Sequence, residues 1–439
     1  MINYKPLWDD ATEKRIRQNA RNMDPQSTSE EVKFCRRCVI SNQRPRIVFD
    51  DEGVCSACRF ADEKQNTIDW LARGEQLTHL LSEHRGGDGK PDIVIPCSGG
   101  KDASSVAHRI KHEHNMNPMC ATWAPIGSTN IGRQNYEAFI GSGFNGVVGH
   151  ADGITHRKLS RLGLEFYGDS FLPFIYGQLF YPLHVAKSLC ISLVMLGENG
   201  EAEYGGDPAA NHKRCWSAED WDRIYLKSAT VSVLMDIGLE LGAFTQYEVD
   251  HISPYYTPPV DFRADVHWFS YYRKWHPQEN FYYASDNTGF QANPDGRSTG
   301  TYSKYASLDD RFDDPHYYMA YIKYGIGRCT SDAAHEIRDG EIDREEAVAL
   351  IKRYDGEFPE RHQPEWYESL GIDEDWFEEI CNRFRPDHVW ETRQPSTPQD
   401  QVWFLRNSVY AEEKIDRPDG HQGTQPREDQ TDGGAQEAG

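Results

Sequence analysis

The sequence has no long apolar run, and this absence excludes membrane-spanning proteins of the helical class. A transmembrane helix needs about 18 or more consecutive apolar residues, whereas the longest apolar stretch, residues 183–196, is interrupted by Lys187. The opening residues MINYKPLWDD are too polar for the apolar core of a secretory signal. We therefore expect a cytoplasmic protein with no membrane partner.

Lysine is also scarce. Asp and Glu number 70 against 47 Lys and Arg, which gives a net charge of −23, and only 16 of the 47 bases are lysine. A surface of this kind favours solubility in concentrated salt, where screening shortens the reach of charge repulsion to about 3 Å. The composition suggests a salt-adapted protein, with an ordinary acidic cytosolic protein as the alternative.

Ten cysteines in 439 residues are too few for a disulfide scaffold, and four of them have a different arrangement. Cys35 and Cys38 form one CxxC pair, and Cys55 and Cys58 form a second pair after sixteen further residues. This spacing predicts a zinc ribbon, in which four thiolates surround one ion and leave no position open for catalysis. Free redox thiols and an iron–sulfur cluster are the alternatives.

The chain has no Walker A loop, but a different glycine turn lies between a predicted strand and a predicted helix. Residues 92–97 are a short apolar run, and apolar residues recur at helical spacing over 103–110. Glycines between them permit φ > 0, and the first N–H groups of the helix favour an anion. The segment SGGKD predicts a phosphate site, with a plain strand-to-helix turn as the alternative; its residues are Ser98, Gly99, Gly100, Lys101 and Asp102.

Short apolar strands and helices alternate after this turn. We expect further strands at 118–123, 145–149 and 190–196, and helices at 133–140, 155–164 and 177–189. The alternation predicts an α/β fold, a parallel sheet with helices on both faces. Ligands of such sheets bind beyond the carboxyl ends of the strands, which makes Thr122 and Trp123 candidate nucleotide contacts.

An acidic, glycine-rich segment, GENGEAEYGG, follows the last of these strands at 197–206. Its carboxylates Glu198, Glu201 and Glu203 are suited to hold Mg²⁺ or to accept hydrogen bonds from a sugar or ammonia. A solvated acidic loop is the alternative.

The pattern divides the chain into successive parts. A polar N-terminal segment (1–30) includes a short helix near 11–22, and the zinc ribbon (31–62) leads to a connecting helix and linker (63–90). The α/β part that carries the predicted phosphate site is 91–215. A mostly helical, aromatic-rich region, expected to complete the site, is 216–390, with helices at 218–228 and 231–241. Residues 412–439 are almost free of apolar side chains, so we expect a disordered acidic tail.

The SGGKD string resembles the S-G-G-x-D-S signature of PP-loop ATP pyrophosphatases. Ala103 stands where that signature has its second serine, and Ser104, the next residue, offers a hydroxyl from a neighbouring position. The order of a four-cysteine ribbon, this loop and the GENGEAEYGG string resembles the N-acetyl sugar amidotransferases of surface-glycan synthesis. The likeness continues through further segments; these are WAP (123–125), PFIYGQ (173–178), WHPQEN (275–280), GTYSK (300–304), LDD (308–310) and GIGR (325–328).

This resemblance implies an ATP-dependent conversion of an acetamido group on a nucleotide-linked sugar into an acetamidino group. The amide oxygen attacks the α-phosphate of ATP, pyrophosphate leaves, and ammonia then displaces AMP. The ammonia comes from partner glutaminase and ammonia-channel subunits that resemble the histidine-biosynthesis synthase pair. The cofactors implied are ATP, Mg²⁺ and a structural Zn²⁺.

Roles for individual residues follow from this chemistry. We expect Lys101, Lys304 and Arg328 to hold phosphate charge, with surface ion pairs as the alternative for the last two. Asp102 and Glu198 are candidate Mg²⁺ ligands, and Glu201 or Glu203 a candidate base for ammonia. The aromatic cluster at 268–275 is suited to stack on a sugar or a uracil ring, with core packing as the alternative.

Two other classes of protein compete with this interpretation. A tRNA-thiolating PP-loop enzyme also combines a zinc ribbon with this loop, but it needs a basic RNA-binding face and usually reactive cysteines. At a net charge of −23, a nucleic-acid partner is not expected. The third class is a non-catalytic nucleotide-binding scaffold.

Overall fold

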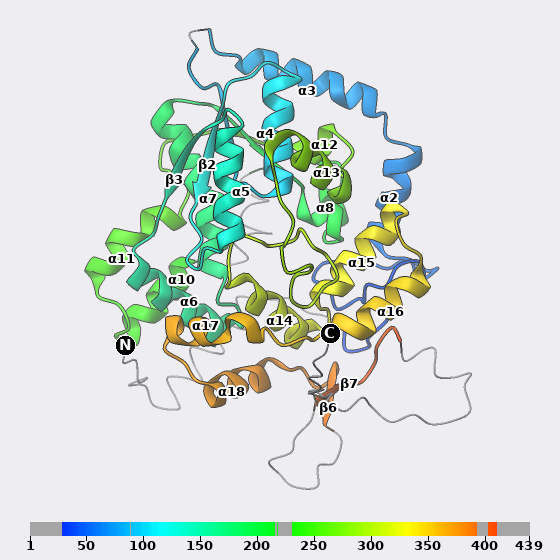
Figure 1. Cartoon of the computed structure of the whole chain (residues 1–439). Coiled ribbons are helices and arrows are strands. Elements are labelled where there is room, and N and C mark those ends of the chain that lie inside the picture. The colour runs from blue at the N-terminus through cyan, green and yellow to red at the C-terminus, as the bar shows by residue number, and fades with distance from the viewer. Residues whose placement is uncertain (1–28, 88, 216, 218–230, 393–402, 411–439) are drawn as a thin grey trace, which may run out of the picture.

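The computed structural model describes residues 29–87, 89–215, 217, 231–392 and 403–410, and Figure 1 shows their arrangement. The predicted helices at 11–22 and 218–228 and the predicted tail at 412–439 lie outside these residues. Among the residues described, no helix combines the length and the apolar character needed to cross a membrane.

A five-stranded parallel sheet forms the centre of the α/β part. Its order is β3-β2-β1-β4-β5, so the chain moves outward from β1 to β3 and then returns to the other side of β1. The carboxyl ends of β1 and β4 therefore border the crossover point, where sheets of this class bind ligands. The strands are β1 (Ile93–Pro96), β2 (Pro118–Trp123), β3 (Asn145–Gly149), β4 (Leu193–Leu196) and β5 (Asp265–Trp268).

Successive side chains of each strand point to opposite faces of the sheet, and each face is covered by a layer of helices. Ile93 and Ile95 of β1 join one core with α3 and α4, whereas Val94 faces the opposite core with α7. The predicted parallel sheet with helices on both faces is thus confirmed. The helices of this part are α3 (Trp70–His84), α4 (Lys101–His112), α5 (Asn130–Gly141), α6 (Gly153–Tyr167), α7 (Leu172–Leu189) and α8 (Gly200–Tyr204).

The C-terminal part is mostly helical, as expected, and its helices α14, α17 and α18 lie in the lower half of Figure 1. Helices α14 and α18 pack around Trp366, and α15 and α16 pack against the cysteine ribbon. The remaining elements are α10 (Val231–Glu240), α11 (Gln246–Ile252), α12 (Phe269–Tyr272), α13 (Pro277–Thr288), α14 (Asp313–Tyr324), α15 (Arg328–Asp339), α16 (Arg344–Tyr354), α17 (Gln363–Leu370), α18 (Glu374–Phe384), β6 (Trp390–Thr392) and β7 (Trp403–Leu405), with 3₁₀ turns at Pro208–Ala210, Ser253–Tyr256 and Glu360–His362.

Two features of the fold differ from expectation. The connecting helix is two helices, α2 (Ser56–Asn66) and α3, because the chain ends α2 at Thr67 and caps α3 with the side chain of Asp69. The strand β5 was not expected, since its four residues DVHW are too few to give a clear period.

The aromatic cluster at 268–275 belongs to the core. Trp268, Phe269, Tyr272 and Trp275 are each at most 4% exposed, and Trp275 packs over Gly197. Of the two interpretations of this cluster, core packing is therefore the one that the structure supports.

Candidate functional site

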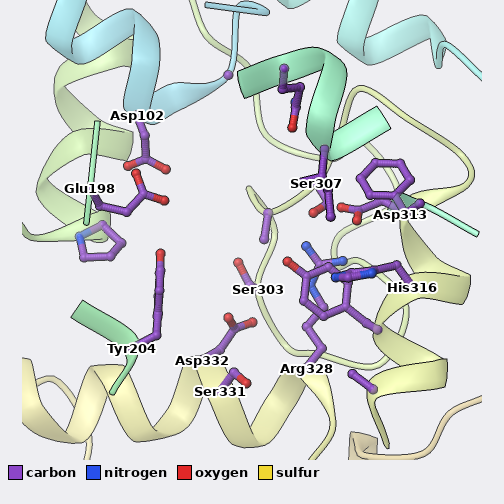
Figure 2. Close-up of a pocket in the computed structure, with 18 of the residues that line it drawn as sticks. Asp102, Glu198, Tyr204, Ser303, Ser307, Asp313, His316, Arg328, Ser331 and Asp332 are labelled. Atoms are coloured by element: carbon purple, nitrogen blue, oxygen red, sulfur yellow. The ribbon is translucent and has the colours of Figure 1, made fainter. Parts of the chain in front are cut away.

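A cavity of about 820 Å³ lies at the carboxyl end of the sheet, and its volume is within the range of roughly 300–1,000 Å³ found for small-molecule sites. Residues 98–103 and the segment after β4 line one side, and residues 303–336 line the other. Figure 2 shows Asp102 and Glu198 together on one side, with Arg328 and His316 on the opposite side.

The glycine turn after β1 opens into this cavity. Gly99 has φ +84°, and a Cβ on it would lie 2.6 Å from the Cα of Tyr136, so only glycine fits without displacing backbone. Gly100 is the N-cap of α4 and offers no side-chain acceptor to the first N–H groups, which leaves them suited to an anionic ligand. Ser98, next to them, donates its hydroxyl to Asp309.

Lys101 and Asp102 begin α4 at the edge of the cavity. The ammonium of Lys101 contacts the Asp102 carboxylate and lies 5.1 Å from the ring centre of Tyr305. Asn280 donates to the other oxygen of Asp102 at 3.0 Å. Across from Asp102, burial and the Asp102 charge together raise the pKa of Glu198 to about 7.

Three predicted nucleotide contacts lie outside the cavity. Ser104 is fully buried with its hydroxyl 3.9 Å from the Cys97 sulfur, because helical spacing turns it toward the sheet whereas Ala103 lines the cavity. Thr122 donates to the Cys97 carbonyl, and Trp123 is 3% exposed in the core beside α7. Ser104 therefore does not replace the missing loop serine. Thr122 and Trp123 do not face the cavity, because the end of β2 lies inside the core.

The two remaining glutamates of the acidic segment are held in ion pairs. Glu201 lines the cavity and accepts from Arg46 Nε at 2.9 Å; burial opposes its ionisation, but this bond and the Arg46 charge lower its pKa. Glu203 is absent from the cavity lining and bonds Lys64 at 2.5 Å. Burial likewise raises the pKa of Glu203, but Lys64 and His335 outweigh it, so neither glutamate is suited to act as a base.

The structure separates the two basic residues predicted in the C-terminal part. Arg328 lines the cavity, is 3% exposed and stacks on Tyr317 at 4.2 Å. Its Nη1 lies 3.7 Å from Asp314 and has no hydrogen-bond partner among the described residues. Lys304 instead lies exposed over the ring of Phe281 and does not line the cavity, so its predicted role in holding phosphate has no support.

Other lining residues were not predicted from the sequence. Arg44 and Arg46 reach the cavity from the cysteine ribbon, and Arg44 also donates to the Gly205 carbonyl. His316 and Asp169 form a hydrogen-bonded pair in the wall. For the two arginines the sequence contains one signal, a basic RPR string between the two CxxC pairs. For His316 it contains none, because a single histidine in a helix has no distinctive pattern.

The four ribbon cysteines converge on one point. Their sulfurs all lie within 4.8 Å of one another, with Cys35 to Cys58 at 3.9 Å and Cys38 to Cys55 at 3.7 Å. Four thiolates about 2.3 Å from a tetrahedral ion are about 3.8 Å apart, so the cluster fits a zinc ion. All four side chains are buried.

Comparison with known proteins adds one match. Residues 299–404 match the family model described as "LPS biosynthesis protein WbpG-like, C-terminal domain". This segment includes α14, α15 and the 303–309 loop, which form one wall of the cavity. No curated protein matches the sequence. The match supports a role in surface-polysaccharide biosynthesis and suggests that the protein is an enzyme.

Proposed function

We propose that the protein is an ATP-dependent amidotransferase that converts an acetamido group of a nucleotide-activated sugar into an acetamidino group. The observation that carries the proposal is a cavity with two unlike walls. One wall is a glycine turn and helix start with Lys101, suited to phosphate; the other lies in the segment similar to an LPS biosynthesis domain.

The phosphate chain of ATP occupies the turn in this proposal. N–H groups of α4 and the ammonium of Lys101 face it, and both stabilise negative charge that grows on the leaving pyrophosphate. An amide oxygen is a weak nucleophile, so the protein must supply position as well as charge. Attack on the α-phosphate gives an O-adenylyl imidate, and ammonia then displaces AMP.

A magnesium ion fits the pair Asp102 and Glu198. The two carboxylates face each other in Figure 2, and their repulsion contributes to the raised pKa of Glu198. A divalent cation would relieve this repulsion, and Mg²⁺ is commonly held by one or two carboxylates together with substrate phosphates. When bound, it would offset charge on the phosphates.

Ammonia in this proposal comes from glutaminase and ammonia-channel subunits, which resemble the histidine-biosynthesis synthase pair. Cysteines of the described residues outside the ribbon are mainly buried, and Cys97, Cys120, Cys329 and Cys381 lie in the core. Such thiols are unsuited to act as a glutaminase nucleophile. An assay with ammonium salts therefore tests this chain by itself.

The test is AMP formation from ATP and Mg²⁺ with ammonium, with and without a mixture of UDP-linked acetamido sugars. The proposal is supported if AMP forms only when both the sugar and ATP are present. Mass spectrometry should then show a sugar product that has lost an oxygen atom and gained a nitrogen atom. AMP that requires tRNA instead would support an RNA-modifying enzyme. Binding of ATP with no AMP under any condition would indicate a scaffold.

A further inference from the structure

A histidine–aspartate pair lies in the cavity wall opposite the glycine turn. His316 of α14 hydrogen-bonds through Nδ1 to Oδ1 of Asp169 at 2.9 Å, and Asp169 follows α6. The same oxygen of Asp169 accepts from the backbone N–H of Phe171 at 2.9 Å. The carboxylate is thus fixed by the backbone, and it in turn fixes the ring.

The second ring nitrogen of His316 remains available. No hydrogen bond to Nε2 is present among the described residues, and the side chain is 28% exposed on the cavity. Figure 2 shows His316 beside Arg328. A base whose one nitrogen is oriented by a carboxylate and whose other nitrogen faces a ligand site is the arrangement used for proton transfer.

Three other titratable groups at the cavity have charged neighbours of their own. His335 has Asp339 3.1 Å from Nδ1 and Glu203 3.8 Å from Nε2. Glu201 is bound to Arg46, and Glu198 lies with Asp102 on the opposite side. Among these groups, His316 is the one whose free ring nitrogen is best placed to accept a proton.

The charges around His316 tune its basicity. Burial lowers the pKa of His316, but the charge and hydrogen bond of Asp169 outweigh it, and Asp313 acts in the same direction. Lys323, two turns further along α14, opposes them. The net result is a raised pKa, which makes the neutral ring a stronger base near neutral pH.

We propose that His316 is the general base of the ammonia step, with Asp169 as the residue that positions it. This inference depends on the amidotransferase reaction proposed above. As ammonia forms a C–N bond to the imidate carbon, the π pair of the C=N bond moves onto the sugar nitrogen. Nε2 takes one proton from the new ammonium group, and the nitrogen pair then re-forms a C=N bond. The C–O bond to AMP then breaks, and its electron pair leaves with the phosphate oxygen. The proton passes from His316 to solvent.

The two half-reactions can be measured separately. Exchange of labelled pyrophosphate into ATP, with sugar present and ammonia absent, reports adenylylation alone. Formation of the substituted amidine with hydroxylamine, which is already unprotonated at neutral pH, reports the second step without the titration of ammonium. The variants are His316→Asn and Asp169→Asn. His362→Asn is the matched control, because His362 pairs with Glu365 at 3.3 Å outside the cavity.

We expect His316→Asn to keep pyrophosphate exchange within about threefold and to lose about 10²-fold in the amine step, the usual scale for a general base. In the parent protein the amine step should rise with pH as His316 loses its proton. This rise should disappear in His316→Asn, move to lower pH in Asp169→Asn and persist in His362→Asn.

Three results would overturn the inference. An unchanged amine step in His316→Asn would show that the ring takes no proton. Loss of both half-reactions together in His316→Asn would show a framework role instead of a catalytic one. Absence of sugar-dependent exchange in the parent protein would remove the proposed reaction itself, and this result is distinct from the other two.

Discussion

Lys101 and Lys304 carry the same charge in unlike surroundings. Lys101 is 8% exposed at the start of α4 and lines the cavity, whereas Lys304 is exposed over Phe281. A preorganised charge directed at a developing negative charge is commonly worth about 10²-fold or more in turnover. We therefore expect Lys101→Ala to lower the rate of AMP formation by that factor with the thermal transition unchanged.

Lys304→Ala is the control for this prediction, and its rate should stay within about twofold of the parent. Equal rates in the parent and in Lys101→Ala would remove Lys101 from the mechanism. A large loss in Lys304→Ala would mean that residues outside the cavity hold the phosphate chain.

The sequence predicts the glycine turn but not the direction of every side chain around it. Gly99 was identified because a positive φ and a close backbone approach leave a local signature, and both are present. Ser104, Thr122 and Trp123 were assigned by proximity in sequence, and the structure turns all three into the core. The direction of a side chain depends on where a helix begins and where a strand ends. The apolar pattern of the sequence fixes these boundaries only to within one or two residues.

At the scale of elements, the start of α15 depends on a carboxylate at the C-cap of α16. Asp355 accepts from the backbone N–H of Gly327 at 3.2 Å and of Thr330 at 3.1 Å. Burial raises the pKa of Asp355 from 3.8 to about 6. The folded protein therefore holds this proton more tightly than the unfolded chain, and the stabilisation is fully present below pH 3.8 and lost as pH rises through 6.

Asp355→Asn keeps an acceptor oxygen but cannot titrate. We expect the free energy of unfolding of the parent, relative to this variant, to fall by on the order of 1 kcal/mol between pH 4 and pH 7. Urea unfolding at several pH values measures the difference. A difference that stays constant, or that grows with pH, would contradict the raised pKa.

The sequence predicted long elements better than short ones. The strands β1 to β4 and the helices between them appear where expected, because an apolar run and a 3.6-residue period extend over enough residues to be unambiguous. The four-residue β5 and the break between α2 and α3 depend on tertiary contacts. β5 exists because it pairs with β4, Leu193 opposite Asp265 through Leu196 opposite Trp268, and no local pattern records that pairing.

At the scale of the whole molecule, the cysteine ribbon is part of the cavity. The loop between the two CxxC pairs carries Arg46, which bonds Glu201, and Arg338 of α15 donates to the Glu203 carbonyl at 3.0 Å and lies 4.0 Å from Cys38. A metal that orders the ribbon therefore also orders the acidic segment. This coupling was not expected from the sequence, since the two segments are more than 150 residues apart.

Loss of the metal should consequently affect both stability and chemistry. We expect one zinc per chain, and we expect Cys35→Ser to lose it, to lower the melting temperature by several degrees or more and to reduce AMP formation. Cys190→Ser is the control, because Cys190 is exposed and distant from the cluster. Metal analysis, melting curves and the AMP assay check these outcomes. Full zinc content in Cys35→Ser would refute the ribbon assignment.

The net charge of −23 acts on the entire molecule. Repulsion among exposed carboxylates opposes the compact state, and its range falls from about 10 Å at 0.1 M salt to about 3 Å at 1 M. We expect the melting temperature to rise by several degrees between 0.1 M and 1 M KCl and then to level off, because screening is nearly complete. KCl and NaCl at equal concentration should act alike, since screening depends on ionic strength, whereas sulfate would add a general exclusion effect. A melting temperature that is highest at the lowest salt would show that the acidic surface is not an adaptation to salt.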